Sequence, residues 1–542
     1  GLPPALFAFS FPFLTFAMLN SRSIQGILVL IVGTFLAIWL GLSIVTNQTE
    51  TIIQVIGAGV FITCLSLGKR IWLLVPFMAA LNIGLRLPGQ PSSLLLAQFL
   101  VLSFCGLLFL MRKLPFHLYL TELELWMLLL TLCVAQVYMG NPVGVNLFGG
   151  DTVGGKGYAL YAIALFSALL FSGLRVPANE LKWILGLSIL GALMSAGVAI
   201  IGKYVPVIGY YTGGYSESTD GGGFDDVVVD AKDASRIGFL SGLSANLSLW
   251  ISSDISPLKA FLRPLWALLV LATVIGAAMS GFRNSIVAVG LTFLIGIAYR
   301  SGFAGLLIAV FGGVGGLAFL AVVNTMHPLP PNFQRSLTFL PGTWEERYKK
   351  DAEGSSEWRF EIWKEALFTD RWIRNKWLGD GLGFSAVELA AQMNYRKGAS
   401  SGISGFDAHR EAILSNGDYH SGPVSTIRVI GYIGLIVFLF AQVRLGVHAH
   451  RQIVRCRGTE WLPLALFMGI PLIAGPFTFV FVFGDFKSGT VGFLLSIGMI
   501  RLLENNLPLP AYVVRRRVPI GLQPGNGANL KEQTLVSSQR RA

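Results

Sequence analysis

Charged residues are scarce in this sequence: they make up 13% of its 542 residues, whereas 53% are hydrophobic. Soluble domains of this total length would carry roughly 25% charged residues to cover their surfaces. The shortage therefore excludes a chain of several soluble domains. It also excludes a disordered chain, which has low hydrophobicity and a high net charge.

Cysteine is the second scarce residue, with four in the whole chain. Cys64, Cys105 and Cys133 lie inside apolar segments, and Cys456 lies in a basic loop. None falls in a long polar loop, so we expect no extracytoplasmic disulfide, and a small fold held together by disulfides is excluded.

Long apolar runs are what the sequence has in abundance. The stretches 24–45, 303–323 and 461–483 each exceed about 20 residues without a charge, enough for a helix to cross a hydrocarbon core of roughly 30 Å. We therefore predict an all-α polytopic membrane protein with about 12–15 transmembrane helices and one large extracytoplasmic loop that contains short helices. The predicted apolar runs are 4–19, 24–46, 51–67, 71–87, 92–111, 124–139, 158–174, 181–201, 238–251, 262–280, 284–299, 303–324, 424–443, 461–483 and 487–503.

The distribution of lysine and arginine predicts the orientation. If the basic tail is cytoplasmic and the helices alternate, the cytoplasmic side holds twenty basic residues and the short loops of the opposite side hold seven. Cytoplasmic loops normally carry this excess. The net charge of +12 would then face anionic lipid headgroups, so membrane lipids are the expected partner and nucleic-acid binding need not be invoked.

This topology divides the chain into four parts: N-terminal transmembrane helices over 1–324, a large periplasmic loop over 325–423, C-terminal transmembrane helices over 424–503 and a basic cytoplasmic tail over 504–542. The loop holds five of the twelve tryptophans. Within it, Glu357–Phe368 has helical periodicity, with Phe360, Trp363 and Leu367 on one face. This helix either lies at the membrane surface, anchored by its aromatic residues, or packs on the rest of the loop.

Three arginines lie at the predicted outer face: Arg236 before an apolar segment, Arg283 in a short turn and Arg428 one turn inside an apolar helix. An ionisable group at this depth is costly unless it is paired, so it suggests a functional role. Guanidinium groups offer paired donors that suit diphosphate oxygens. The alternative is that Arg236 and Arg283 reach lipid headgroups and that Arg428 pairs with a loop carboxylate.

Two of the six histidines lie in Asp-x-His triplets, Asp407-Ala-His409 and Asp418-Tyr-His420. His420 comes shortly before a membrane helix, near the predicted depth of Arg283 and Arg428. It could take a proton from an acceptor hydroxyl, ligate a metal together with the other triplet, or be structural. His448 and His450 lie in a predicted basic loop, where we expect them to be solvated.

A glycine-rich segment ending at Lys156 fits the G-x-x-x-x-G-K pattern of phosphate-binding loops. The next residue is Gly157, where a magnesium-binding Ser or Thr is required, and no buried strand precedes it. We therefore interpret it as a glycine-rich loop.

Four blocks, in order, resemble the O-antigen ligase/polymerase superfamily of bacterial envelope glycosyltransferases. They cover about residues 236–440. The blocks are Arg236-Ile-Gly-Phe…Ser-Ala-Asn246; Met279-Ser-Gly-Phe-Arg283-Asn-Ser; Arg359-Phe-Glu-Ile-Trp363-Lys-Glu-Ala…Trp377-Leu-Gly-Asp-Gly-Leu-Gly383; and His420-Ser-Gly…Gly431-Tyr-Ile-Gly-Leu435.

The resemblance implies a bacterial inner-membrane enzyme of about a dozen helices that acts at the periplasmic face without metal or other cofactor. It would transfer a glycan from undecaprenyl diphosphate to a glycan or lipid acceptor, and polysaccharide assembly proteins are candidate partners. Arg236, Arg283 and Arg428 would hold the diphosphate and His420 would act as the base, with Arg359, His409 and Asp418 contributing from the loop. The alternative function is a lipid-linked oligosaccharide flippase or another transporter.

Overall fold

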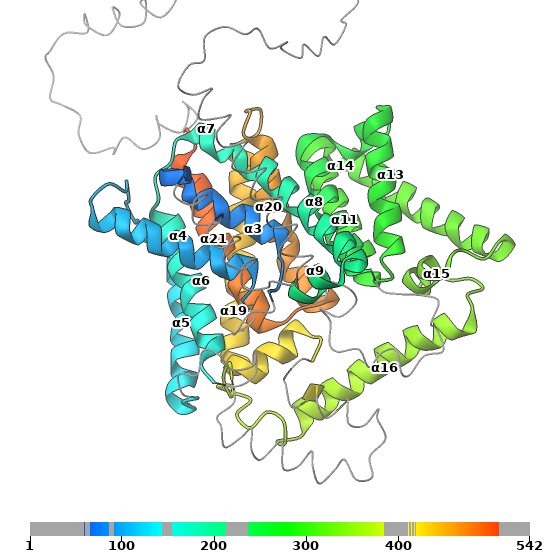
Figure 1. The fold of residues 1–542 in the computed structure, drawn as a ribbon. Helices are drawn as coiled ribbons and strands as arrows, with labels where there is room; N and C mark the ends of the chain where they lie inside the picture. Colours follow the sequence, from blue (N-terminus) through cyan, green and yellow to red (C-terminus); the bar gives the residue numbers. More distant parts are fainter. Residues whose placement is uncertain are drawn as a thin grey trace, which may run out of the picture.

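The structure, a computed structural model, describes residues 59, 66–85, 91–143, 154–212, 237–383, 410, 413–414, 417 and 419–508. These residues form helices and connecting segments, and no β-strand occurs among them. The helices, shown in Figure 1, are η1 (Gly68–Leu73), α3 (Leu74–Leu81), α4 (Ser93–Leu110), α5 (Glu122–Gly140), α6 (Lys156–Gly173), α7 (Ala178–Leu181), α8 (Trp183–Tyr204), α9 (Pro206–Tyr211), α11 (Gly238–Asp254), α12 (Pro257–Ala260), α13 (Pro264–Met279), α14 (Arg283–Met326), α15 (Pro331–Leu337), α16 (Glu346–Phe368), α19 (Gly422–Arg455), α20 (Leu462–Phe477), η2 (Thr478–Val482) and α21 (Phe486–Asn506).

The predicted fold class is confirmed. Within the described part of the chain, eight helical segments are long and apolar enough to cross a membrane, and α13 is a shorter apolar helix. Leucines 125, 128 and 132 on α5 are each more than half exposed, as expected for a surface that faces lipid rather than water. The protein is therefore a multi-pass membrane protein. The predicted runs 4–19 and 24–46, and almost all of 51–67, lie outside the described residues.

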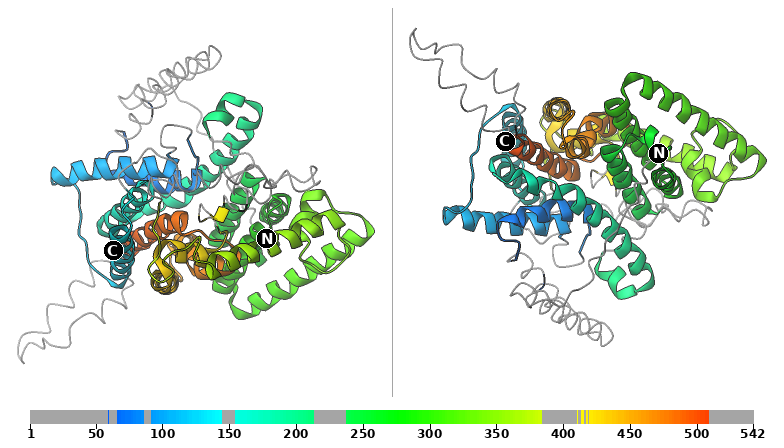
Figure 2. Two further views of the ribbon diagram at one scale, coloured as in Figure 1. Left: turned by 90° about the horizontal axis from the view of Figure 1, so that it is seen from below. Right: turned by 90° about the horizontal axis from the view of Figure 1, so that it is seen from above.

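Two groups of helices make up the bundle (Figures 1 and 2). One contains α4, α5, α6, α19, α20 and α21, with α6 packed along α21 and α19 along α20. The other contains α8, α11, α13 and α14, and it joins the first where α20 packs against α11 and α14. In the first group the buried ring of Phe438 meets the rings of Phe479, Phe486 and Phe493, with centroids 5.1–5.2 Å apart. This aromatic cluster ties α19, η2 and α21 together.

One predicted boundary is confirmed, and others differ from the structure. The boundary predicted between the runs 284–299 and 303–324 is confirmed, because α14 consists of two helical halves that meet at a kink at Gly302, where φ is +71°. The run 71–87 becomes a 3₁₀ helix followed by a short α3, which ends at left-handed Asn82. The run 424–443 continues to Arg455, because hydropathy detects the apolar part of a helix and not its polar extension.

The two ends of the bundle differ. We call the end where α19 begins the His420 end and the end where α21 finishes the Arg501 end. The loop segments 327–383 lie at the His420 end: Ser336 of α15 donates a hydrogen bond to the carbonyl of Ala278, near the end of α13, and α16 packs against α19.

Candidate functional site

His420 lies immediately before α19, in a backbone conformation that few residues adopt. Its φ is +50°, in the left-handed region, where non-glycine residues are uncommon but histidine is enriched. The next residue, Ser421, is the N-cap of α19, and its hydroxyl accepts a hydrogen bond from the N–H of Val424. Such backbone positions persist where surrounding contacts hold them, and they cluster at functional sites.

Aromatic rings on two other elements flank the half-buried imidazole of His420. Its ring centroid lies 6.0 Å from that of Trp358 on α16 and 5.8 Å from that of Phe483, just after η2. The carbonyl of Tyr419, a fully buried residue, accepts a 2.7 Å hydrogen bond from Nε1 of Trp363. Residues from three segments that are far apart in sequence therefore meet at His420.

The structure shows how α16, the helix predicted over Glu357–Phe368, packs on its surroundings. Ile362 and Ala366 are fully buried against the segment before α19 and against its first turns, and Trp363 and Leu367 pack beside them. Phe360, predicted to share the apolar face, is 66% exposed. The helix thus packs on the rest of the protein through a face centred on Ile362, and it is longer than predicted at its N-terminal end.

Helix α19 is broken at Gly431, and a loop segment fills the break. Gly431 has φ +71°, and a Cβ there would lie 2.1 Å from the carbonyl oxygen of Trp377. The N–H groups of Asp380 and Gly381 donate to the carbonyls of Arg428 and Val429 at 2.8 and 3.0 Å. The N–H of Tyr432 donates to the carbonyl of Lys376 at 2.9 Å. These bonds satisfy backbone groups that the break would otherwise leave unpaired.

The loop that fills the break is the glycine-rich block Trp377–Gly383. It also packs against the start of α6: the N–H of Leu382 donates to the hydroxyl of Tyr158 at 3.2 Å, and Gly383 lies against Gly154. The segment before Lys156, which resembled a phosphate loop, therefore meets this loop.

Arg428 lies beside this break and is paired with a carboxylate. Its Nη1 is 3.2 Å from Oδ2 of Asp380, and the two side chains are 8% and 9% exposed. The oxygens of Asp380 also accept hydrogen bonds from the N–H groups of Arg374 and Asn375, both at 2.9 Å. The structure thus shows the alternative in which Arg428 pairs with a loop carboxylate. A role in holding a diphosphate stays a prediction.

Arg283 is the first residue of α14 and is half-buried. The turn before it contains Gly281 with φ +75°, and the N–H of Ile237 donates to the carbonyl of Ser280 at 2.9 Å. Helix α14 packs against α20 and η2, the elements that lead to Phe483. Arg283 lies at the His420 end, because α15 of the loop contacts the end of α13 just before it: the side chain of Asn332 donates a hydrogen bond to the carbonyl of Met279 at 3.0 Å.

The other predicted site residues divide into two groups. Arg359 follows Trp358 on α16 and is half-buried. Arg236, His409 and Asp418 lie outside the described residues. No group of three or more metal-ligating side chains occurs within the described ranges, and the metal alternative rests in part on the residues outside them.

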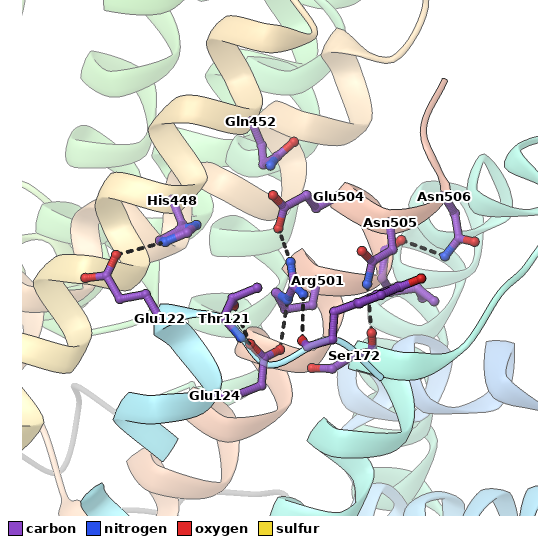
Figure 3. Close-up of polar contacts among 12 residues, drawn as sticks. Thr121, Glu122, Glu124, Ser172, His448, Gln452, Arg501, Glu504, Asn505 and Asn506 are labelled. Atoms are coloured by element: carbon purple, nitrogen blue, oxygen red, sulfur yellow. Dashed lines mark hydrogen bonds and ion pairs between the residues drawn. The ribbon is translucent and has the colours of Figure 1, made fainter. Parts of the chain in front are cut away.

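A second polar cluster, which sequence analysis missed, lies at the Arg501 end (Figure 3). Arg501 and Glu124 are nearly fully buried, at 3% and 1% side-chain exposure, and Nε of Arg501 is 2.8 Å from Oε1 of Glu124. Arg501 also pairs with Glu504 and donates to the carbonyl of Tyr119. Asn505 and Asn506 donate to the carbonyls of Ser172 and Leu174. The cluster joins the ends of α5, α6 and α21.

His448 belongs to the same region, and the prediction that it is solvated is wrong. Its ring is 14% exposed, and Nε2 lies 3.5 Å from Glu122, which also pairs with Arg444. His450 is exposed, and its Nδ1 hydrogen-bonds the hydroxyl of Tyr299 at 2.5 Å. The sequence signal for this cluster was Arg501, because a charge inside an apolar run such as 487–503 is normally paired.

Comparison of the sequence with protein-family models and with curated proteins gives no match. The residues and their geometry are therefore the basis on which a function is assigned.

Proposed function

We propose that the protein is a bacterial inner-membrane glycosyltransferase of the O-antigen ligase/polymerase type. It would move a glycan from undecaprenyl diphosphate to the hydroxyl of a glycan or lipid acceptor at the periplasmic face. The observation that carries the proposal is the placement of His420. A half-buried imidazole at the start of a membrane helix, flanked by Trp358 and Phe483, is a suitable general base.

In the proposed reaction the acceptor oxygen attacks the anomeric carbon of the donor sugar, and its proton passes to the imidazole of His420. The bond between that carbon and the diphosphate oxygen breaks, and the carrier diphosphate leaves with the bonding electrons. The leaving group gains negative charge as the bond breaks, so cationic and N–H donors placed beside it lower the barrier.

Arg283 is the proposed cation for the leaving diphosphate. It occupies the first turn of α14, where the helix N-terminus favours an anion. The hydroxyl of Ser285 and the side-chain oxygen of Asn284 are buried there, without hydrogen-bond partners among the described residues. Arg236 is the second proposed diphosphate ligand, on the sequence prediction alone.

A lipid-linked oligosaccharide flippase or another transporter is the second candidate, and one observation favours it. Helix α19 is discontinuous at Gly431, and a loop pairs with the freed backbone groups. Discontinuous membrane helices of this kind form substrate sites in many transporters.

The experiment that separates the two candidates uses protein reconstituted in liposomes with glycan-linked undecaprenyl diphosphate and an acceptor glycan. Release of free undecaprenyl diphosphate measures transfer. We expect His420→Ala and Arg283→Ala each to reduce the rate at least about 100-fold, on the scale of lost acid–base or electrostatic catalysis.

The matched controls are His327→Ala and Arg263→Ala, at exposed positions that are not part of the proposed site. Both should retain the full rate. Full activity of His420→Ala and Arg283→Ala would refute the assignment. Movement of the intact donor across the membrane without release of diphosphate would establish the transporter.

A further inference from the structure

Trp363 of α16 reaches the backbone directly before His420. Its indole nitrogen Nε1 donates a hydrogen bond to the carbonyl oxygen of Tyr419 at 2.7 Å. That carbonyl and the N–H of His420 belong to the same peptide unit, which is planar. The φ angle of His420 describes rotation relative to this plane. The indole bond therefore fixes one of the two sides that determine φ.

The other side of His420 is fixed by the start of α19. The hydroxyl of Ser421, the N-cap, accepts a hydrogen bond from the N–H of Val424, and its carbonyl accepts one from the N–H of Ser425 at 2.9 Å. His420 is the single residue between these two fixed parts, and it adopts φ +50°. A left-handed backbone is costly for a residue with a Cβ, so it persists where surrounding contacts enforce it.

Helix α16 holds Tyr419 by its side chain as well as by its carbonyl. The ring of Tyr419 is fully buried in one hydrophobic cluster with Ile362 and Ala366 of α16. Earlier on the same helix, the ring of Trp358 lies 6.0 Å from the imidazole of His420. One helix thus positions both the backbone before His420 and one of the rings beside it.

Trp372 provides an internal comparison. It is half-buried like Trp363 and packs against the same hydrophobic cluster. Its indole Nε1, however, donates to Oε1 of Glu365 at 2.8 Å, a side chain and not the backbone before His420. The two tryptophans therefore share their surroundings and differ in the acceptor of the indole N–H.

We propose that Trp363 is a positioning residue for His420: its indole N–H holds the carbonyl of Tyr419 and thereby keeps the imidazole between Trp358 and Phe483. The inference rests on the proposed function, in which His420 is the general base. A base must lie within hydrogen-bond reach of the proton that it removes. A misplacement of about 1 Å can reduce the rate about 100-fold.

The first test measures the position of the imidazole and does not require transfer. The full chain in lipid nanodiscs is treated with diethyl pyrocarbonate, which acylates an imidazole nitrogen. Mass spectrometry of the peptides gives the modification rate of His420 relative to that of exposed His327. We expect Trp363→Phe to raise this ratio at least about three-fold, because a side chain released from its contacts becomes more accessible. Trp372→Phe, the matched control, should leave the ratio unchanged.

An isosteric replacement separates the hydrogen bond from packing. In 3-benzothienylalanine a sulfur atom replaces the indole N–H and the bicyclic shape is kept. Placed at position 363, it should raise the ratio as Trp363→Phe does. A smaller rise or a fall in either variant would overturn the proposal, and so would an equal rise in Trp372→Phe.

The second test is the transfer assay with glycan-linked undecaprenyl diphosphate. Trp363→Phe should lower kcat by about 10–100-fold and leave the KM for the donor within about two-fold, because the change affects the base and not donor binding. An unchanged kcat, or a loss carried by KM alone, would overturn the positioning role. If the unmodified protein shows no transfer, the proposed function is refuted, and the modification ratio still decides whether Trp363 positions His420.

Discussion

At the scale of single residues, the buried pair of Asp380 and Arg428 is the interaction most sensitive to change. Each side chain is less than a tenth exposed. The carboxylate also holds two backbone N–H groups of the loop. Removing one member of such a pair leaves a buried charge without its partner, which costs more than the pair itself contributes.

We predict that Asp380→Ala lowers the free energy of unfolding by about 3–5 kcal/mol. The double variant Asp380→Ala, Arg428→Met should regain a large part of this loss, because it removes the unpaired charge. Unfolding of the purified protein in detergent, followed by tryptophan fluorescence, measures both effects.

Asp370→Ala is the control for this prediction. Asp370 pairs with Lys376, but its side chain is 89% exposed. Exposed ion pairs contribute about 0–1 kcal/mol. A loss in Asp380→Ala no larger than that in Asp370→Ala would mean that the buried pair does not hold the loop in place.

At the scale of elements, α19 is two helical segments joined by a break at Gly431. The first segment follows the N-cap Ser421 and carries Arg428, and the second contributes Phe438 to the bundle core. The inserted loop supplies the hydrogen bonds that a continuous helix would have made internally. The position of His420 relative to the bundle therefore depends on the loop being seated in the break.

We predict that Gly431→Ala destabilises the protein by more than about 2 kcal/mol, because the left-handed backbone itself disfavours a side chain by about 1–2 kcal/mol and the Cβ would also collide with Trp377. Gly492→Ala, on a regular and open stretch of α21, should be neutral or stabilising by up to about 1 kcal/mol. Equal stabilities of the two variants, measured by urea or thermal unfolding, would show that the break is not required.

At the scale of the whole molecule, the two ends of the bundle have different polar chemistry. The His420 end has aromatic side chains around a histidine and a loop inserted in a helix. The Arg501 end has a buried ionic cluster that joins α5, α6 and α21 (Figure 3). The proposed function requires the His420 end to face the periplasm, as the distribution of lysine and arginine predicts.

We predict that a cysteine placed at exposed Asp370 reacts with a membrane-impermeant maleimide in intact spheroplasts. A cysteine at Glu460, exposed at the opposite end, should react only after permeabilisation. Native Cys456 makes little background, since it is buried and burial raises the pKa of its thiol to about 11. The reverse labelling pattern would contradict the proposed orientation.

The fold class and the positions of the helices could be predicted from the sequence because both depend on the local hydropathy of the chain. Apolar runs of sufficient length must be helical in a bilayer, where each backbone group needs an internal partner. Most of the spans within the described residues are close to their predicted positions. The boundaries failed where a helix continued past its apolar part, as α19 does to Arg455, whereas the predicted gap between 299 and 303 contains the kink of α14 at Gly302.

The sequence by itself determined that this chain is a helical, multi-pass membrane protein, and it singled out His420, Arg283 and Arg428 as residues of interest. Only the tertiary structure decided their partners: Arg428 meets Asp380, Arg501 meets Glu124, and His420 lies between Trp358 and Phe483. The physical reason is that these partners lie tens to hundreds of residues apart along the chain. A local pattern records which residue needs a partner, but the packing of helices decides which one it finds.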